Sequence, residues 1–119
     1  MKPRIILESR VPSIGKVLGL NPVAITLGCW IFVAGKTATP TLIQHETIHV
    51  KQWNEMLWVG FMLFYGWDYL KGIILYRSSW KAYRSSRFEQ EAREGQSSEG
   101  YVECRRRFAW WHYKVRSPV

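Results

Sequence analysis

Cysteine and acidic residues are scarce in this chain. Only two of its 119 residues are cysteines, and the spacing of Cys29 and Cys104 matches no metal-binding pattern. We expect free thiols in a reducing compartment, with a disulfide as the alternative, because their distance in space cannot be read from the sequence. Nine acidic residues stand against 17 lysines and arginines, so the net charge of +8 predicts attraction to anionic partners such as nucleic acid or acidic lipid.

The sequence also lacks a clear signal peptide and a clear membrane span. Glu8 and Arg10 interrupt the apolar core that a signal peptide needs. Residues 57–76 are strongly apolar and about as long as a span, but they include Asp68 and Lys71, which are costly at bilayer depth. We expect a buried helix there, or one lying on a membrane surface, in a cytoplasmic protein that is membrane-associated in the second case.

The apolar content predicts one globular domain over residues 1–119, since 47% of the chain is apolar and 15% is aromatic. Two strands are predicted, one within residues 2–12 and a longer one over residues 23–34. Residues 13–22 are expected to be a connection, because glycine and proline punctuate them. No repeat or low-complexity segment is visible.

Three helices are predicted after the strands. They span residues 40–56, 57–76 and 86–94. Thr39 can cap the first helix and Pro40 can be its first residue, where the missing N–H does no harm. We expect a break in the second helix near Gly66, a loop before the third helix, and Gly95 as the C-cap of the third. The basic and aromatic tail, residues 101–119, is expected to pack back onto the domain.

The motif HETIH at residues 45–49 places two of the three histidines around a glutamate. Positions i and i+4 lie on one helix face, so His45 and His49 can both reach one Zn²⁺ at about 2.0–2.1 Å. Glu46 is rotated by about 100° from His45 and can act as a general base on a water held by the metal. The alternative is a pair of packed histidines without a metal.

A catalytic zinc site needs a third protein ligand. The extended motif HExxHxxGxxH is excluded, because Gln52 and Glu55 occupy its glycine and last histidine positions. The candidates elsewhere are Glu55, Asp68, Glu89, Glu91, Glu94 and His112. Asp68 could instead orient a histidine ring. The segment RFEQEA is favoured, and at most one of Glu89 and Glu91 can be a ligand, since residues two apart face opposite sides of a helix.

HETIH followed forty residues later by FEQEA resembles the gluzincin group of zinc metallopeptidases. More narrowly, the chain resembles the small bacterial and phage-type enzymes called minigluzincins, and the resemblance covers residues 23–95. It implies a small zincin-like domain, in which a short sheet packs on the HExxH helix. It also implies a zinc peptidase whose ligands are His45, His49 and Glu89, with Glu91 in reserve, and whose general base is Glu46.

A peptide or protein substrate is implied by the same resemblance. In zincin-like folds the strand before the metal helix forms the rim of the cleft, so residues 29–33 are expected to offer a free edge to a peptide. Tyr83, Arg84 and His112 are candidates by residue type for stabilising an oxyanion. Tyr83 is preferred because it is close in sequence to the favoured third ligand, although a partly buried core tyrosine is the alternative.

A different class of function is a metal-stabilised binding module with little or no catalysis. Arginines and aromatic residues alternate in two segments, residues 77–87 and 105–113. Such a surface can bind single-stranded nucleic acid by stacking and phosphate contact, although no nucleic-acid-binding motif accompanies it. The neighbouring apolar helix slightly favours an anionic membrane surface instead. The alternative is a basic face that is solvated and binds no partner.

Overall fold

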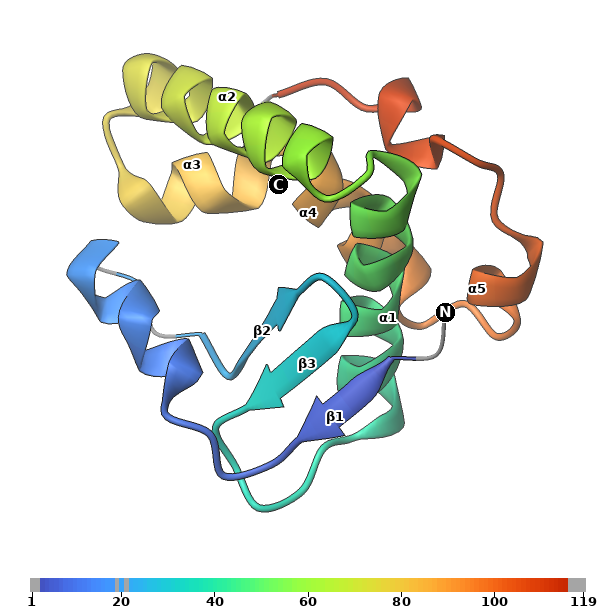
Figure 1. Cartoon of the computed structure of the whole chain (residues 1–119). Coiled ribbons are helices and arrows are strands. Elements are labelled where there is room, and N and C mark those ends of the chain that lie inside the picture. Colours follow the sequence, from blue (N-terminus) through green and yellow to red (C-terminus); the bar gives the residue numbers. More distant parts are fainter. Residues whose placement is uncertain (1–2, 19, 21, 116–119) are drawn as a thin grey trace.

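Over residues 3–18, 20 and 22–115, which the computed structural model describes, the protein has an α+β fold (Figure 1). A three-stranded sheet packs against the long helix α1 (Pro40–Glu55), and further helices pack around α1. The predicted fold class, with a short sheet on the HETIH helix, is confirmed at this level. α4 and α5 lie alongside α1, whereas α2 and α3 lie towards its C-terminal end, away from the sheet.

The sheet is mixed and has β3 at its centre. β1 (Arg4–Ile6) runs parallel to β3 (Trp30–Val33), and β2 (Ala24–Leu27) runs antiparallel to β3. The prediction of one strand over residues 23–34 is therefore wrong. Gly28 turns the chain between β2 and β3 with a φ of +64°, and a Cβ there would lie 2.5 Å from the Trp58 ring. A 3-10 helix, η1 (Val11–Leu18), also replaces part of the predicted connection.

Helix α1 begins at the predicted residue and ends at Glu55, one residue before the predicted end. The hydroxyl of Thr39 accepts a hydrogen bond from the backbone N–H of Leu42 at 3.1 Å, and Pro40 opens the first turn. Val50 packs against the buried side chains Ile31 and Val33 of β3, which forms one part of the core. This contact fixes α1 against the sheet and turns its HETIH face towards the following helices.

Helix α2 (Val59–Tyr76) differs from its prediction in two ways. It is continuous through Gly66, and it buries only Phe61, Asp68 and Gly72. The expectation of a buried helix is therefore wrong for most of its surface. No helix within the described residues has both the length and the apolar character needed to cross a bilayer. α2 instead lies at the periphery, packed along α3 (Figure 1).

Two short helices follow where one was predicted. α3 (Ser79–Ser85) occupies a segment predicted as a loop, and α4 (Arg87–Gly95) agrees with the predicted helix over residues 86–94. Serine capping explains the difference: Ser78 accepts from the N–H of Lys81, and Ser86 ends α3 while accepting from the N–H of Glu89. The prediction of Gly95 as the C-cap is wrong by one residue, because Gly95 is the last residue of α4 and Gln96 is its C-cap.

The described part of the C-terminal tail, residues 101–115, packs back onto the domain, as predicted, and residues 116–119 lie outside the described residues. The tail forms α5 (Tyr101–Cys104) and η2 (Ala109–His112). Trp110 is buried against Phe88, with ring centroids 4.8 Å apart, and closes a second aromatic part of the core. Cys29 is buried, Cys104 is exposed, and both are free thiols, as expected.

Candidate metal centre

Two histidines from α1 and a carboxylate from α4 meet in the interior. Nε2 of His45 lies 3.3 Å from Oε1 of Glu89, and Nε2 of His49 lies 3.2 Å from Oε2 of the same residue. The candidate ligand atoms of the three residues all lie within 4.8 Å of one another, and they form the one such group found in the described part of the chain. The fold thus brings together the three residues that the resemblance implied.

Each histidine is oriented by a glutamine. Nδ1 of His49 is 2.7 Å from Oε1 of Gln52, and Nδ1 of His45 is 2.7 Å from Oε1 of Gln96. The amide nitrogen of Gln52 donates to the Phe88 carbonyl and to Glu91, so its oxygen is the atom left to accept from His49. Both rings therefore carry a proton on Nδ1 and turn Nε2 towards Glu89, the nitrogen available to a metal.

The electrostatics couple the three side chains. Burial alone would lower the pKa of His49, but the charge and hydrogen bond of Glu89, with help from Glu46, outweigh it and raise the pKa to about 9. Burial acts to raise the pKa of Glu89, and the facing His49 and His45 outweigh it and hold that pKa well below its usual range. Tyr65 donates a hydrogen bond of 2.9 Å to Glu89. Without a metal, the cluster is held by these imidazole–carboxylate contacts.

The buried acids differ in what neutralises them. Arg87 pairs with Asp68 at 2.8 Å, and Arg105 pairs with both Glu91 and Glu55. Glu89 has no lysine or arginine among the ion pairs of the described residues; its partners are the two histidines and a tyrosine hydroxyl. A buried carboxylate needs a positive partner. Two imidazoles and one carboxylate are the ligand set of many catalytic zinc sites, so these residues fit a zinc ion.

The other predicted ligand candidates lie elsewhere. Asp68 accepts from the Arg87 side chain and backbone, so it neither joins the cluster nor orients a histidine. Glu91 faces Arg105 and Tyr101, on the opposite side of α4 from Glu89, as the spacing predicted. Glu94 accepts from the Tyr113 hydroxyl, and His112 lies in η2 at a separate surface pocket.

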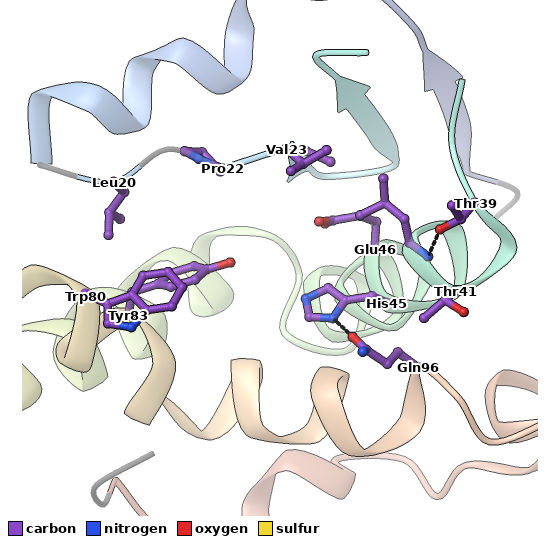
Figure 2. Close-up of a pocket in the computed structure, with 12 residues that line it drawn as sticks. Leu20, Pro22, Val23, Thr39, Thr41, His45, Glu46, Trp80, Tyr83 and Gln96 are labelled. Atoms are coloured by element: carbon purple, nitrogen blue, oxygen red, sulfur yellow. Dashed lines mark hydrogen bonds between the residues drawn. The ribbon is translucent and has the colours of Figure 1, made fainter. Parts of the chain in front are cut away.

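A pocket of about 360 Å³ opens beside the cluster, with His45 and Glu46 in one wall and Trp80 and Tyr83 in another. Figure 2 shows the Glu46 carboxylate and the Tyr83 hydroxyl pointing into this space from opposite sides. Oε2 of Glu46 accepts a 2.6 Å hydrogen bond from the Thr26 hydroxyl. The charge of Glu89 and burial raise the pKa of Tyr83 well above its usual range, so its hydroxyl stays protonated.

The strand at the pocket is not the predicted one. β3 pairs on both of its edges, so the expectation that residues 29–33 offer a free edge is wrong. β2 is one of the two edge strands, and its first residue Ala24 and the preceding Val23 line the pocket. The difference arises because residues 23–34 fold as a hairpin, which places the first half of the segment outside the second.

Four residues that support the site were missed from the sequence: Thr26, Gln52, Tyr65 and Gln96. Gln52 had a signal, because it follows His49 by three residues and therefore shares its helix face. The other three come from separate elements, and only the folded chain brings them to the cluster. Arg84, considered for an oxyanion, places its guanidinium 5.3 Å from the centroid of the Trp80 ring.

Comparison with known proteins adds no relative. No protein-family model matches the chain, and searches of curated proteins and of solved structures find no match.

Proposed function

We propose that this protein is a zinc-dependent hydrolase, most simply a small zincin-like metallopeptidase of the minigluzincin type. The observation that carries the proposal is the convergence of His45, His49 and Glu89, whose candidate ligand atoms lie within 4.8 Å of one another. Glu46 borders the same pocket as His45, which is where a general base is needed. The two free thiols of the protein are consistent with a cytoplasmic location, where thiols stay reduced.

Nε2 of His45, Nε2 of His49 and the Glu89 carboxylate would hold the ion. When bound, zinc would polarise a substrate carbonyl and make a water molecule acidic enough to attack near neutral pH. Gln52 and Gln96 keep both histidines in the tautomer that presents Nε2. Glu89 supplies the negative charge that offsets part of the charge of the ion.

Glu46 would take the proton from the attacking water and return it to the leaving nitrogen. Thr26 holds Oε2 of Glu46, so the carboxylate keeps a fixed orientation while its other oxygen remains available for the proton. Tyr83 would donate its hydroxyl proton in a hydrogen bond to the carbonyl oxygen as negative charge develops there. Its raised pKa keeps that donor protonated at neutral pH.

An extended peptide suits the shape of the site. The outer edge of β2 leaves backbone groups that can pair with a peptide strand. Val23 and Ala24 at the start of β2 lie in the pocket wall with Glu46, so a peptide paired there would pass the general base. The aromatic wall of Trp80 and Tyr83 favours an apolar substrate side chain.

Zinc content and the Glu46→Gln variant test the proposal. Untagged protein, purified without chelators, should contain about one zinc per chain by elemental analysis, and Glu89→Gln should lose it. Glu46→Gln should keep the zinc and lower hydrolysis of an unfolded protein such as casein by at least about a hundredfold. Glu99→Gln, an exposed glutamate with the same change in charge, is the matched control and should behave like the wild type.

Three results would count against this function. If the purified protein contains no zinc, the proposed metal site is wrong. If the Glu46→Gln variant is fully active, Glu46 is not the general base. Zinc-loaded wild type that hydrolyses no peptide in a broad library, detected by mass spectrometry, would favour the metal-stabilised binding module instead.

A further inference from the structure

The outward side of α2 is an apolar surface. Six large side chains on successive turns follow one face of the helix and are between 51% and 69% exposed. This outer row consists of Val59, Met62, Leu63, Trp67, Leu70 and Ile74. Leu57, which is 84% exposed, lies two residues before the first residue of the helix. Soluble monomers rarely expose a continuous apolar patch of more than a few hundred Å².

No described element covers the outer row. α2 packs through Phe61, Asp68 and Gly72 onto the rest of the protein, and these residues face away from the row. In Figure 1, α2 lies along the upper edge of the molecule, with α3 beneath it. The attachment of α2 to the rest of the protein does not require apolar residues on its outer side, where polar residues would serve as well. The apolar outer row therefore indicates a partner.

The exposed charges on α2 and the residues next to it are all positive. Between Glu55 and Arg93, the four acidic side chains are at most 8% exposed, because each is held in an internal contact. The exposed charged side chains of the same segment are Lys71, Arg77 and Lys81. An apolar row beside cations without exposed anions complements a surface that is apolar inside and negatively charged outside.

We propose that the outer row of α2 docks on an anionic lipid bilayer, with the helix lying in the membrane interface. The apolar side chains would enter the boundary between headgroups and acyl chains, and Trp67 would sit at the headgroup level. Lys71, Arg77 and Lys81 would contact lipid phosphates. A symmetric dimer through the same face is the weaker alternative, because it would bring these cations together without exposed acids to pair with them.

Vesicle sedimentation tests the proposal with the wild-type chain. The protein should sediment with vesicles of phosphatidylglycerol and phosphatidylcholine, and much less with phosphatidylcholine alone. Binding should weaken between 50 mM and 500 mM NaCl, since salt screens the attraction between cations and phosphates. Free glycerol phosphate should not compete, which separates a bilayer from a phosphate ligand. Failure to bind anionic vesicles at low salt would overturn the proposal without the use of any variant.

The variants separate the apolar and the charged contributions. Leu63→Asn combined with Leu70→Asn should abolish sedimentation, while Ile14→Asn, an equally exposed apolar residue of η1, should not change it. Replacement of Lys71, Arg77 or Lys81 by Gln should weaken binding to anionic vesicles about fivefold each. All variants should retain zinc and the wild-type circular dichroism spectrum, which shows that they fold.

Two outcomes would assign the surface differently. If the Leu63 and Leu70 replacements leave vesicle binding unchanged, the outer row is not the docking surface. If the wild type is a dimer by analytical ultracentrifugation, ignores vesicles, and becomes a monomer on the same replacements, the occupant is a second copy of the chain. Neither result bears on the zinc site, since hydrolysis of a soluble peptide does not require the membrane.

Discussion

Oε1 of Gln52 lies 2.7 Å from Nδ1 of His49, and the amide nitrogen of the same glutamine bonds Glu91 at 3.0 Å. Gln52 therefore links the candidate metal cluster to the ion pair between Glu91 and Arg105. This arrangement divides the buried acids into two roles. Glu89 faces the histidines, whereas Glu91, two residues later, is part of the internal scaffold.

The glutamine contacts predict an effect on zinc affinity. Gln96→Ala removes the partner of His45 Nδ1, so the ring loses its fixed orientation, and we expect zinc to bind about 10- to 100-fold more weakly. A competition titration with a zinc-sensitive chelator measures this. Gln44→Ala is the matched control, because the Gln44 side chain bonds the backbone carbonyls of Gly95 and Ser98 rather than the ring of either histidine. Equal affinities for the two variants would contradict the orienting role.

Arg105 is expected to matter for stability rather than for zinc. It pairs with Glu91 and Glu55, so Arg105→Ala leaves two nearly buried carboxylates without a cation. We expect the free energy of unfolding to fall by about 3–5 kcal/mol in urea titrations. Arg106→Ala, at the neighbouring exposed position, should change it by less than about 0.5 kcal/mol. A similar small change for both variants would show that the network contributes little.

Alanine substitutions at two glycines of α2 are expected to have opposite effects on the free energy of unfolding. A Cβ at Gly72 would lie 2.7 Å from the Ala82 Cα, so Gly72→Ala forces α2 and α3 apart and should cost about 1–3 kcal/mol. Gly66 has no atom within 4 Å of such a Cβ, so Gly66→Ala should raise helix propensity and add about 0.5–1 kcal/mol. Thermal and urea unfolding measure both. A loss of stability in Gly66→Ala would contradict the continuous helix seen here.

Because of Tyr101, we expect the stability of the protein to depend on pH in the alkaline range. Burial, and then its hydrogen bond to Glu91, raise the pKa of Tyr101 from 10.0 to about 12. The folded state thus keeps a proton that the unfolded chain loses above pH 10, so the contribution is complete below pH 10 and is lost as the pH rises to about 12. Tyr101→Phe should make unfolding less sensitive to pH in that window. An unchanged pH profile would contradict the assignment.

The sequence by itself determined the local features of the site. Thr39 and Pro40 set the start of α1, and helix periodicity places His45 and His49 on one face of it. The same reasoning separated Glu89 from Glu91 before the fold was known. These inferences succeed because capping and side-chain direction depend on residues within one or two turns.

Only the tertiary structure decided which distant groups meet. Gly28 turned a predicted single strand into a hairpin, which made β2, not β3, the edge beside the pocket. The sequence left Asp68 as a possible ligand, but in the folded chain it forms an ion pair with Arg87. The exposure of α2 was also hidden, since an apolar helix has the same pattern whether it is covered by protein or left for a partner. Pairing and burial between remote segments depend on how the whole chain packs, and no local pattern encodes that result.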